Sequence, residues 1–233
     1  AQVGADIDGE AADDQSGYSV SLSSDGSRVA IGAYRNDGNG SNSGHVRIYD
    51  YNTSTEAWAQ VGADIDGEAE GDVSGWKVSL SSDGSRVAIG ANNNDGNGTN
   101  SGHVRIYGYN GSAWVQVGAD IDGEAVQDQS GRSISLSSDG SRVAIGAPFN
   151  DGNGSNSGHV RVYSISSGDS YQYTWDVDSG GAPSDGTYTV TVTGADLAGN
   201  AYSGTDSITF TLDTTSPTVT LTDTDADNLV SAS

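Results

Sequence analysis

The stretch SVSLSSDGSRVAIGA, residues 19–33, contains two short strings in which apolar residues alternate with small or polar residues. A period of two is the pattern of a strand with one buried face, and Val20 and Leu22 would share that face. Between the strings lies Asp25-Gly26, a pair that supplies the positive φ of a tight hairpin turn. The stretch therefore predicts a β-hairpin.

The hairpin belongs to a longer unit that occurs three times. Residues 1–10 read AQVGADIDGE, residues 59–68 repeat them, and residues 115–124 differ only at the first position. Each unit adds two further alternating strings, of which His45–Tyr49 and Trp58–Ile65 are the first examples. Four strands in about 57 residues is the size of one β-propeller blade. We therefore predict an all-β fold with three four-stranded, propeller-blade-like repeats, at residues 1–58, 59–114 and 115–163.

A second kind of sequence begins at about residue 164, where Thr and Ser take over and the repeat ends. Alternating strings such as Thr187–Thr193 are separated there by turn residues, which is typical of a sandwich of short strands. About 60 residues fall short of the roughly 100 that a complete sandwich needs, so we expect a partial one.

The charge balance limits the partners. The chain has 32 acidic and 9 basic residues and a net charge of −23. Nucleic acids and anionic membranes both require a basic surface, so we expect neither as a partner. Cysteine is absent, and no apolar run approaches the roughly 20 residues of a membrane span, so no direct membrane insertion is expected. The lack of methionine predicts a piece of a longer polypeptide.

The repeat resembles the FG-GAP family, known from integrin-type propellers and many bacterial surface proteins. The resemblance is carried by Gly17-x-x-Val20, by Val29–Ala33 and by Gly44-x-Val46-x-Ile48-Tyr49, with Gly146-Ala147-Pro148 in the third copy. The longer signature is similar to repeats of large secreted proteins of marine microbes. The family's Asp-rich calcium loop is reduced here to a Ser-Ser-Asp-Gly turn, so that calcium site is not transferred.

The Thr-rich part resembles the bacterial immunoglobulin-like domains of giant adhesins. The residues that carry this resemblance are Trp175–Asp178, Gly186–Val190, Asp196–Asn200 and Asp213–Pro217. It implies a partial immunoglobulin-like β-sandwich at residues 164–217 and the start of a following domain at residues 218–233. Together the two resemblances imply an extracellular or cell-surface protein.

Two segments of each repeat carry oxygen ligands at spacings that suit a cation, and calcium is the cofactor they suggest. In the Gly-rich loop the candidate ligands are Asp37, Asn39, Asp95, Asn97, Asp151 and Asn153. In the AQVGADIDGE segment alternate carboxylates would face one side of a strand, namely Asp6, Asp8, Asp64, Asp66, Asp120 and Asp122. The alternatives are a solvated connector of Asn-Gly turns and, in the second segment, aspartates that face water while Ile7 points to the core.

Three histidines, His45, His103 and His159, recur at one position of the repeat. Three equivalent imidazoles indicate a structural role, because a reaction centre uses one irregular arrangement of residues instead of three copies. The same argument applies to the abundant Ser and Asp residues. We therefore expect no catalytic residues and a protein that is not an enzyme.

The positions that differ between copies gather at the open end of the hairpin, opposite the Asp-Gly turn. Aromatic, Arg and Asn side chains at one rim suit the hydroxyls and ring faces of a sugar, or the surface of another protein. The alternative is neutral drift at exposed positions. The predicted ligand rim consists of Tyr18, Tyr34, Arg35, Trp76, Asn92, Asn93, Arg132 and Phe149.

The preferred interpretation is an extracellular adhesin or filament module that serves as a spacer and contact surface. The alternative is a glycan-binding, lectin-like propeller that uses the variable rim. Propellers close with 4–8 blades, and the exposed edges of an open array invite pairing. We therefore predict self-association or contact with neighbouring repeats as the partner interaction, with a glycan or a host cell-surface protein as the ligand.

Overall fold

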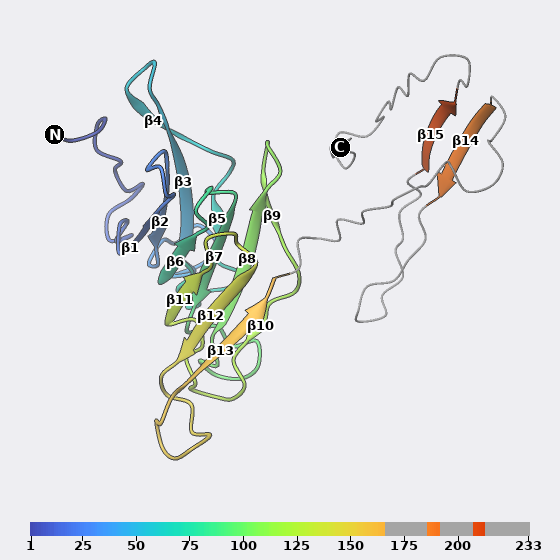
Figure 1. Ribbon diagram of the computed structural model, residues 1–233. Coiled ribbons are helices and arrows are strands. Elements are labelled where there is room, and N and C mark those ends of the chain that lie inside the picture. Colours follow the sequence, from blue (N-terminus) through green and yellow to red (C-terminus); the bar gives the residue numbers. More distant parts are fainter. Residues whose placement is uncertain (166–185, 192–206, 213–233) are drawn as a thin grey trace. The chain divides into compact units, whose positions relative to one another are not determined.

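The computed structural model describes residues 1–165, 186–191 and 207–212, which form strands joined by turns (Figure 1). The chain divides into two compact units, residues 1–169 and 170–233, and each is considered by itself. Within the described residues no helix is long and apolar enough to cross a membrane.

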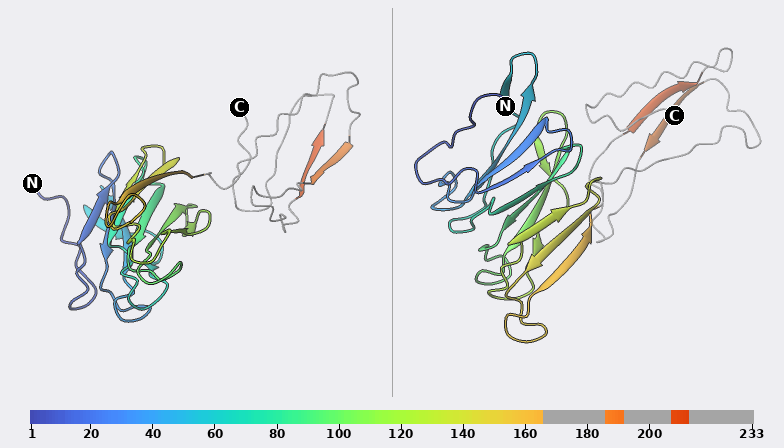
Figure 2. Two further views of the ribbon diagram at one scale, coloured as in Figure 1. Left: turned by 90° about the horizontal axis from the view of Figure 1, so that it is seen from below. Right: turned by 60° about the vertical axis from the view of Figure 1, so that its left-hand side comes forward.

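The first unit contains three antiparallel sheets, one for each repeat (Figures 1 and 2). The strands of the first sheet are β1 Ser19–Leu22, β2 Arg28–Ala33, β3 His45–Asn52, β4 Ala57–Gln60 and β5 Ile65–Asp66. Those of the second are β6 Lys77–Leu80, β7 Arg86–Ala91, β8 His103–Tyr109, β9 Trp114–Gln116 and β10 Ile121–Asp122. Those of the third are β11 Ser133–Leu136, β12 Arg142–Ala147 and β13 His159–Ser164. The all-β class and the three propeller-like repeats are therefore confirmed.

The predicted hairpin opens each sheet. Strands β1 and β2 pair antiparallel, with Val20 opposite Ile31 and Leu22 opposite Val29. In the turn, Gly26 has a φ of 71°, and the Asp25 carboxylate accepts hydrogen bonds from the Ser27 amide and hydroxyl groups at 3.0 and 2.9 Å. The turn chemistry of the sequence thus fixes the register of the two strands.

The fourth strand is interrupted, whereas the alternation predicted one continuous strand over residues 58–65. Strand β4 pairs with the C-terminal half of β3, and β5 pairs with its first two residues. Between them Gly62 has a φ of 75°, which turns the chain out of the strand. The second sheet repeats this arrangement with β9 and β10. The described part of the third sheet has three strands.

The hydrophobic core lies between neighbouring sheets. Val46 of β3 belongs to the same buried cluster as Val78 and Leu80 of β6, across the first junction. An equivalent cluster contains Val104 of β8 and Ile134 of β11 at the second junction. Alternation therefore buries one sheet face against the next repeat, as in stacked propeller blades.

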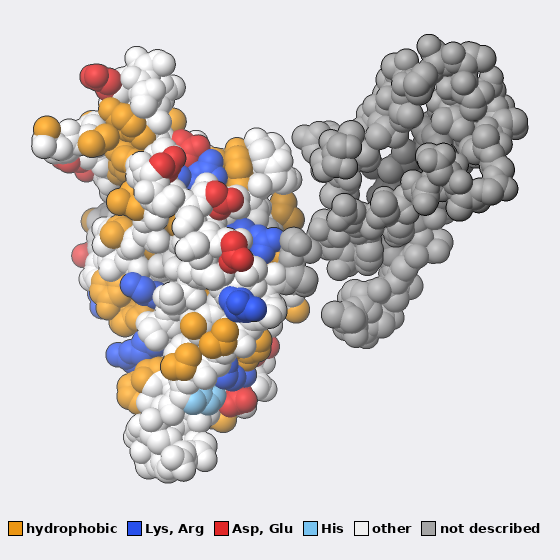
Figure 3. Space-filling model, viewed as in Figure 1, with side chains coloured by type: hydrophobic (Ala, Val, Ile, Leu, Met, Phe, Trp, Pro, Cys, Tyr) orange, Lys and Arg blue, Asp and Glu red, His pale blue; other side chains and the backbone are white. Residues whose placement is uncertain are grey.

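Among the described residues, nothing covers the two outer sheet faces of this stack. Val78 is 2% exposed, but its equivalent in the first sheet, Val20, is 59% exposed. Likewise Val46 is 0% exposed, and its equivalent in the third sheet, Val160, is 68% exposed. The space-filling view shows hydrophobic side chains at the surface of the described sheets in several places (Figure 3). We call the face with Val20 and Leu22 and the face with Val160 and Val162 the end faces.

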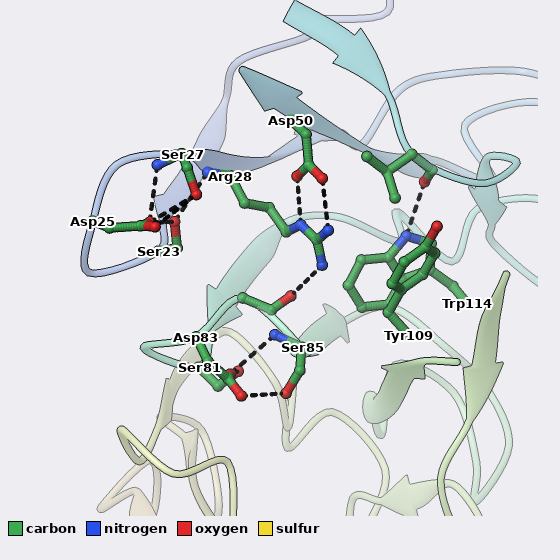
Figure 4. A network of polar contacts seen from close by, with 12 residues as sticks. Ser23, Asp25, Ser27, Arg28, Asp50, Ser81, Asp83, Ser85, Tyr109 and Trp114 are labelled. Carbon is green, nitrogen blue, oxygen red and sulfur yellow. Dashed lines mark hydrogen bonds and ion pairs between the residues drawn. The ribbon is translucent and has the colours of Figure 1, made fainter. Parts of the chain in front are cut away.

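Polar contacts also join neighbouring sheets, and Arg28 of β2 illustrates them (Figure 4). Its guanidinium binds both carboxylate oxygens of Asp50 on β3, at 2.6 and 2.7 Å. It also donates to the Gly84 carbonyl in the next repeat at 2.9 Å, and it lies 5.0 Å from the Tyr109 ring and 5.7 Å from the Trp114 ring. One side chain thereby ties the first two sheets together.

The described residues of the second unit form strands β14 Gly186–Thr191 and β15 Ser207–Leu212. They pair antiparallel, with Gly186 opposite Leu212. The other predicted strands of residues 164–217, and the expected start of a domain at residues 218–233, lie outside the described residues. The immunoglobulin-like assignment therefore stays a prediction.

Candidate functional site

The repeats place their variable residues in line with one another. Tyr18, Trp76 and Arg132 each come directly before the first strand of their sheet, and Tyr34 directly follows β2. The first strands lie side by side: the Ser19 hydroxyl on β1 accepts from the Val78 amide on β6 at 3.1 Å. Residues at the same end of these strands are therefore neighbours, although about 57 residues separate them in the sequence.

Three aromatic rings form the centre of this line. The ring centroids of Tyr18 and Tyr34 are 4.5 Å apart, those of Tyr18 and Trp76 4.8 Å, and those of Tyr34 and Trp76 4.9 Å. The interplanar angles of 51° to 72° are the tilted arrangements that aromatic pairs prefer. Each ring contacts both others, so the cluster extends from the first repeat into the second.

Arg132 continues the line into the third repeat. Its guanidinium carbon lies 5.7 Å from the Trp76 ring centroid and 5.1 Å from that of Phe149. The guanidinium also donates to the Gln129 side chain. Cation–π contacts of this length orient the arginine over the rings. We call the line formed by Tyr18, Tyr34, Trp76, Arg132 and Phe149 the ridge.

The ridge contains one buried ring, held by a hydrogen bond, and rings that are exposed to solvent. Tyr34 is buried, and its hydroxyl donates to Gln15 at 2.8 Å. Tyr18 is 49% exposed, Phe149 is also exposed, and Trp76 is half-buried. Large ring faces held in place by neighbours, with an arginine among them, are the residue types of binding hot spots.

The structure brings most residues of the predicted rim close to one another. Arg35 lies 5.5 Å from the Tyr34 ring and so adjoins the ridge. Asn92 and Asn93 occupy the equivalent positions after β7, where the Asn92 amide donates to Asn93 Oδ1 at 3.0 Å. Asn92 is buried, and its Oδ1 atom has no hydrogen-bond partner among the described residues.

The Gly-rich loops make hydrogen bonds that hold the next repeat. Asn39 donates through Nδ2 to the carbonyls of Gly67 and Glu68, at 2.8 and 3.1 Å, and Asn97 does the same one repeat later. Asp37 Oδ1 accepts from the backbone amide of Asn42 at 2.7 Å, as do Asp95 and Asp151 in their own loops. Asn153 lies in the third loop, where its amide nitrogen donates to Ser157. These contacts describe a connector, and calcium binding by the loop stays a prediction.

The carboxylates of the AQVGADIDGE segment line two equivalent hollows between the outer strands. One, of about 250 Å³, is lined by Asp6 and Asp8 with Trp58, and the other, of about 200 Å³, by Asp64 and Asp66 with Trp114. The paired aspartates have separate surroundings. The side chain of the first aspartate accepts a hydrogen bond from the glutamine four residues earlier, at Asp6, Asp64 and Asp120. The second aspartate accepts through its backbone carbonyl from an arginine: Asp8 from Arg47, Asp66 from Arg105 and Asp122 from Arg161.

The histidines begin the third strand of each sheet, and two of them are enclosed. His45 and His103 are each 1% exposed. Burial lowers the pKa of His103, and the nearby Arg105 lowers it further, while Asp120 and Glu68 act in the opposite direction. The imidazole is therefore neutral at neutral pH. Glu10, Glu68 and Glu124 recur within the segment predicted to hold a cation. The sequence did not indicate that they lie beside these histidines.

Comparison with known proteins bears on the fold. A model of the FG-GAP repeat matches residues 6–49, 63–107 and 119–163, and the curated proteins give no match. Similar solved structures include a candidate 6-phosphogluconolactonase from Bacteroides uniformis (12% identity, TM-score 0.44) and the periplasmic gluconolactonase of Pseudomonas aeruginosa (15%, 0.39). A third is the β-propeller domain of the Trilobed protease from Pyrococcus furiosus (12%, 0.39). They cover 88%, 88% and 84% of this chain but 52%, 55% and 53% of their own, so the chain spans about half their length.

The expectation that the chain is not an enzyme is contradicted by the likeness to the two lactonase structures. Its premise was that equivalent copies of a residue do not make a reaction centre. A repeated scaffold can still carry one unequal site where its copies differ, and the copies differ here at the ridge. At 12% and 15% identity the likeness assigns no reaction to this chain.

Proposed function

Because the chain belongs to the FG-GAP repeat family through three matched repeats, we propose that it is a β-propeller-type contact module of an extracellular adhesin or filament. The observation that carries this proposal is the ridge. It joins side chains from all three repeats in one surface line, at positions where the repeats differ.

The physical argument starts from the cost of exposed rings. Apolar surface in water is unfavourable by roughly 25 cal/mol per Å², so a partner that covers Tyr18 and Phe149 gains free energy. Tyr34 and Trp76 hold the rings in a fixed arrangement, which reduces the entropy lost on binding. Arg132 adds a directional donor group beside them. This composition favours a specific contact over general adhesiveness.

The charge of the chain supports an extracellular setting. A net charge of −23 keeps such a module soluble and repels other acidic surfaces unless salt screens the repulsion. The ridge carries Arg132, with Arg35 beside it, and so supplies positive charge in an acidic protein. An uncharged or acidic ligand surface is thus the one it suits.

A glycan is the second candidate ligand, and the aromatic rings favour it. Sugar rings present apolar C–H faces that lie against aromatic rings and hydroxyl groups that hydrogen-bond to Arg and Asn side chains. The exposed face of Tyr18 and the half-buried Trp76 provide the first kind of contact, and the exposed Arg132 provides the second. A host protein surface offers apolar contact with fewer hydroxyls.

The test is binding of the whole chain, attached to beads, to two panels: immobilised neutral polysaccharides and extracellular matrix proteins. Trp76→Ala and Arg132→Ala should each lower affinity about 30-fold, the loss typical of a hot-spot side chain. The matched control is Tyr51→Ala, because Tyr51 stacks on Trp58, outside the ridge. Equal binding by the ridge variants and the parent chain would refute the contact surface. Binding restricted to the protein panel would refute the glycan candidate.

The end faces support the filament part of the proposal. Each junction inside the chain packs a face like that of Val160 and Val162 against a face like that of Val20 and Leu22. The two uncovered faces are therefore complementary, and a second copy fits head to tail through the same contacts. Light scattering should detect dimers or larger species. Val162→Lys should remove them, and Val126→Lys, at an exposed valine outside both faces, should not. A monomer at all concentrations would contradict self-association.

A further inference from the structure

Three ligating side chains from distant stretches converge between the first and second sheets. Glu68 follows β5, His103 begins β8, and Asp120 directly precedes β10. His103 Nδ1 lies 3.7 Å from Glu68 Oε2 and 3.9 Å from Asp120 Oδ2. The three ligand atoms lie within 4.8 Å of one another. An equivalent group with the same two distances is formed by Glu10, His45 and Asp64.

In the group formed by Glu10, His45 and Asp64, the imidazole is buried, and one of its ring nitrogens has no partner among the described residues. His45 is 1% exposed, and its Nε2 atom has no hydrogen bond. Its Nδ1 atom faces the two carboxylates at distances beyond those of a hydrogen bond. A cation at this point would give Nδ1 a ligand bond and would offset the charge of the two carboxylates that face it.

The glutamate is oriented by an arginine. Arg105 Nη1 lies 3.4 Å from Glu68 Oε1, which leaves Oε2 directed at His103. Arg105 Nη2 also donates to the Asp66 carbonyl at 2.7 Å, so the guanidinium is itself fixed. Two carboxylates against one guanidinium leave an excess negative charge beside the imidazole. The arginine is therefore a positioning residue, and the excess charge attracts a cation.

The spacing of the three ligand atoms indicates the kind of cation. In a regular tetrahedron with bonds of about 2.05 Å, as for zinc, ligand atoms lie roughly 3.3 Å apart. The measured 3.7 and 3.9 Å need only a small inward shift of the half-exposed carboxylates. Calcium takes 6–8 oxygen ligands, and an imidazole nitrogen is not among its usual ones. Zinc accepts this mixture of His nitrogen and carboxylate oxygen.

We propose that the groups Glu10–His45–Asp64 and Glu68–His103–Asp120 each bind one zinc-class divalent ion. Each ion takes three protein ligands, and its fourth position faces water between the exposed carboxylates. In the second sheet, the ion joins the segment before β6, through Glu68, to β8 and to the segment before β10, through His103 and Asp120. It is thus a structural ion of the blade junction, and it shares Asp64 and Asp120 with the ligands predicted for calcium but adds the histidines and glutamates.

The third copy serves as an internal comparison. His159 Nδ1 lies 3.4 Å from Glu124 Oε2, and among the described residues this single carboxylate faces it. The histidine is also more open, with 25% of its side chain exposed against 2% for His103. The described residues therefore contain two complete groups, which predicts two zinc ions bound to each chain.

The test is a calorimetric titration of the whole chain with zinc chloride, with calcium chloride titrated in parallel. We expect two zinc ions per chain, and a large excess of calcium should not displace them. Asp120→Asn should remove one site, a loss larger than the roughly 10–100-fold of an outer-shell change. The matched control is Asp122→Asn, which removes the same charge two residues away, outside the group. It should leave two sites.

A second measurement guards against misfolding. Asp120 is about a third exposed, so its variant should keep the circular dichroism spectrum of the parent chain. Cobalt bound to the parent chain should give the absorption bands of a tetrahedral ion, and His103→Gln should weaken them about twofold while His159→Gln leaves them unchanged. Equal zinc binding by Asp120→Asn and Asp122→Asn, or displacement of zinc by calcium, would overturn the proposal.

Discussion

One valine position tests the stacking of the sheets in three contexts. Val46, Val104 and Val160 are equivalent residues, and each can be shortened to alanine with the same loss of two methyl groups. Val46 and Val104 are 0% exposed in the junction clusters, and Val160 is 68% exposed on an end face. The chemistry is constant, so any difference between the variants reports the surroundings alone.

The expected magnitudes follow from burial. Removing two buried methyl groups costs about 2 kcal/mol, including a small cavity term. In a chain of this size that loss lowers the midpoint of thermal unfolding by roughly 4–8 °C. The exposed valine should cost less than about 0.5 kcal/mol. Val46→Ala and Val104→Ala should therefore be clearly destabilised, and Val160→Ala should resemble the parent chain.

The assay is urea unfolding of each variant, followed by tryptophan fluorescence and circular dichroism at several protein concentrations. At low concentration, equal losses for all three valines would refute the stacking, because Val160 is 68% exposed and the other two valines are buried. If copies associate through the end faces, the Val160→Ala loss should grow as concentration rises.

Two further substitutions have matched controls, and a titration tests the hairpin turn. Gly75→Ala should lower the free energy of unfolding by more than the control Gly71→Ala, which should lower it by about 1 kcal/mol. Both glycines have φ near 83°, but a Cβ atom at Gly75 would lie 2.5 Å from the His45 carbonyl, whereas one at Gly71 meets nothing within 4 Å. Equal losses in urea unfolding would contradict this. Arg28→Met should lower the free energy of unfolding by about 1–2 kcal/mol, because it removes charged hydrogen bonds. The control Arg142→Met, at an exposed arginine, should lower it by less than about 0.5 kcal/mol. The reverse order would count against the role of Arg28 at the junction. Hydrogen bonds from Ser23 and then Ser27 lower the pKa of Asp25 from 3.8 to about 2. The contribution of Asp25 to stability is therefore complete above about pH 4 and is lost as the pH falls toward 2. An NMR titration of this carboxyl group with a midpoint near 3.8 would disprove the turn geometry.

Much of the fold could be predicted from the sequence, because alternation and turn chemistry act locally. Val20 and Leu22 share a face as predicted, and the Asp25-Gly26 turn pairs the strands in register. The break in the fourth strand was missed because a single Gly62 within a polar segment reads equally well as part of an edge strand.

The candidate site could be predicted only in part, since it depends on how repeats stack. Sequence differences identified Tyr18 and Trp76 as variable positions at one rim. The 4.8 Å approach of their rings needs the first strands to lie side by side, which no local pattern specifies. In the same way, Asp64 was paired with Asp66 on the basis of strand alternation, whereas the break before β5 places it beside His45.

The match between the two end faces has a consequence for how the protein can evolve. A duplication of one repeat would insert a unit whose two sheet faces already fit the facing surfaces of its two neighbours. No new contact has to be invented, and each added copy contributes the same junction energy as the last. The array can therefore be lengthened or shortened by whole units without a change at the junctions.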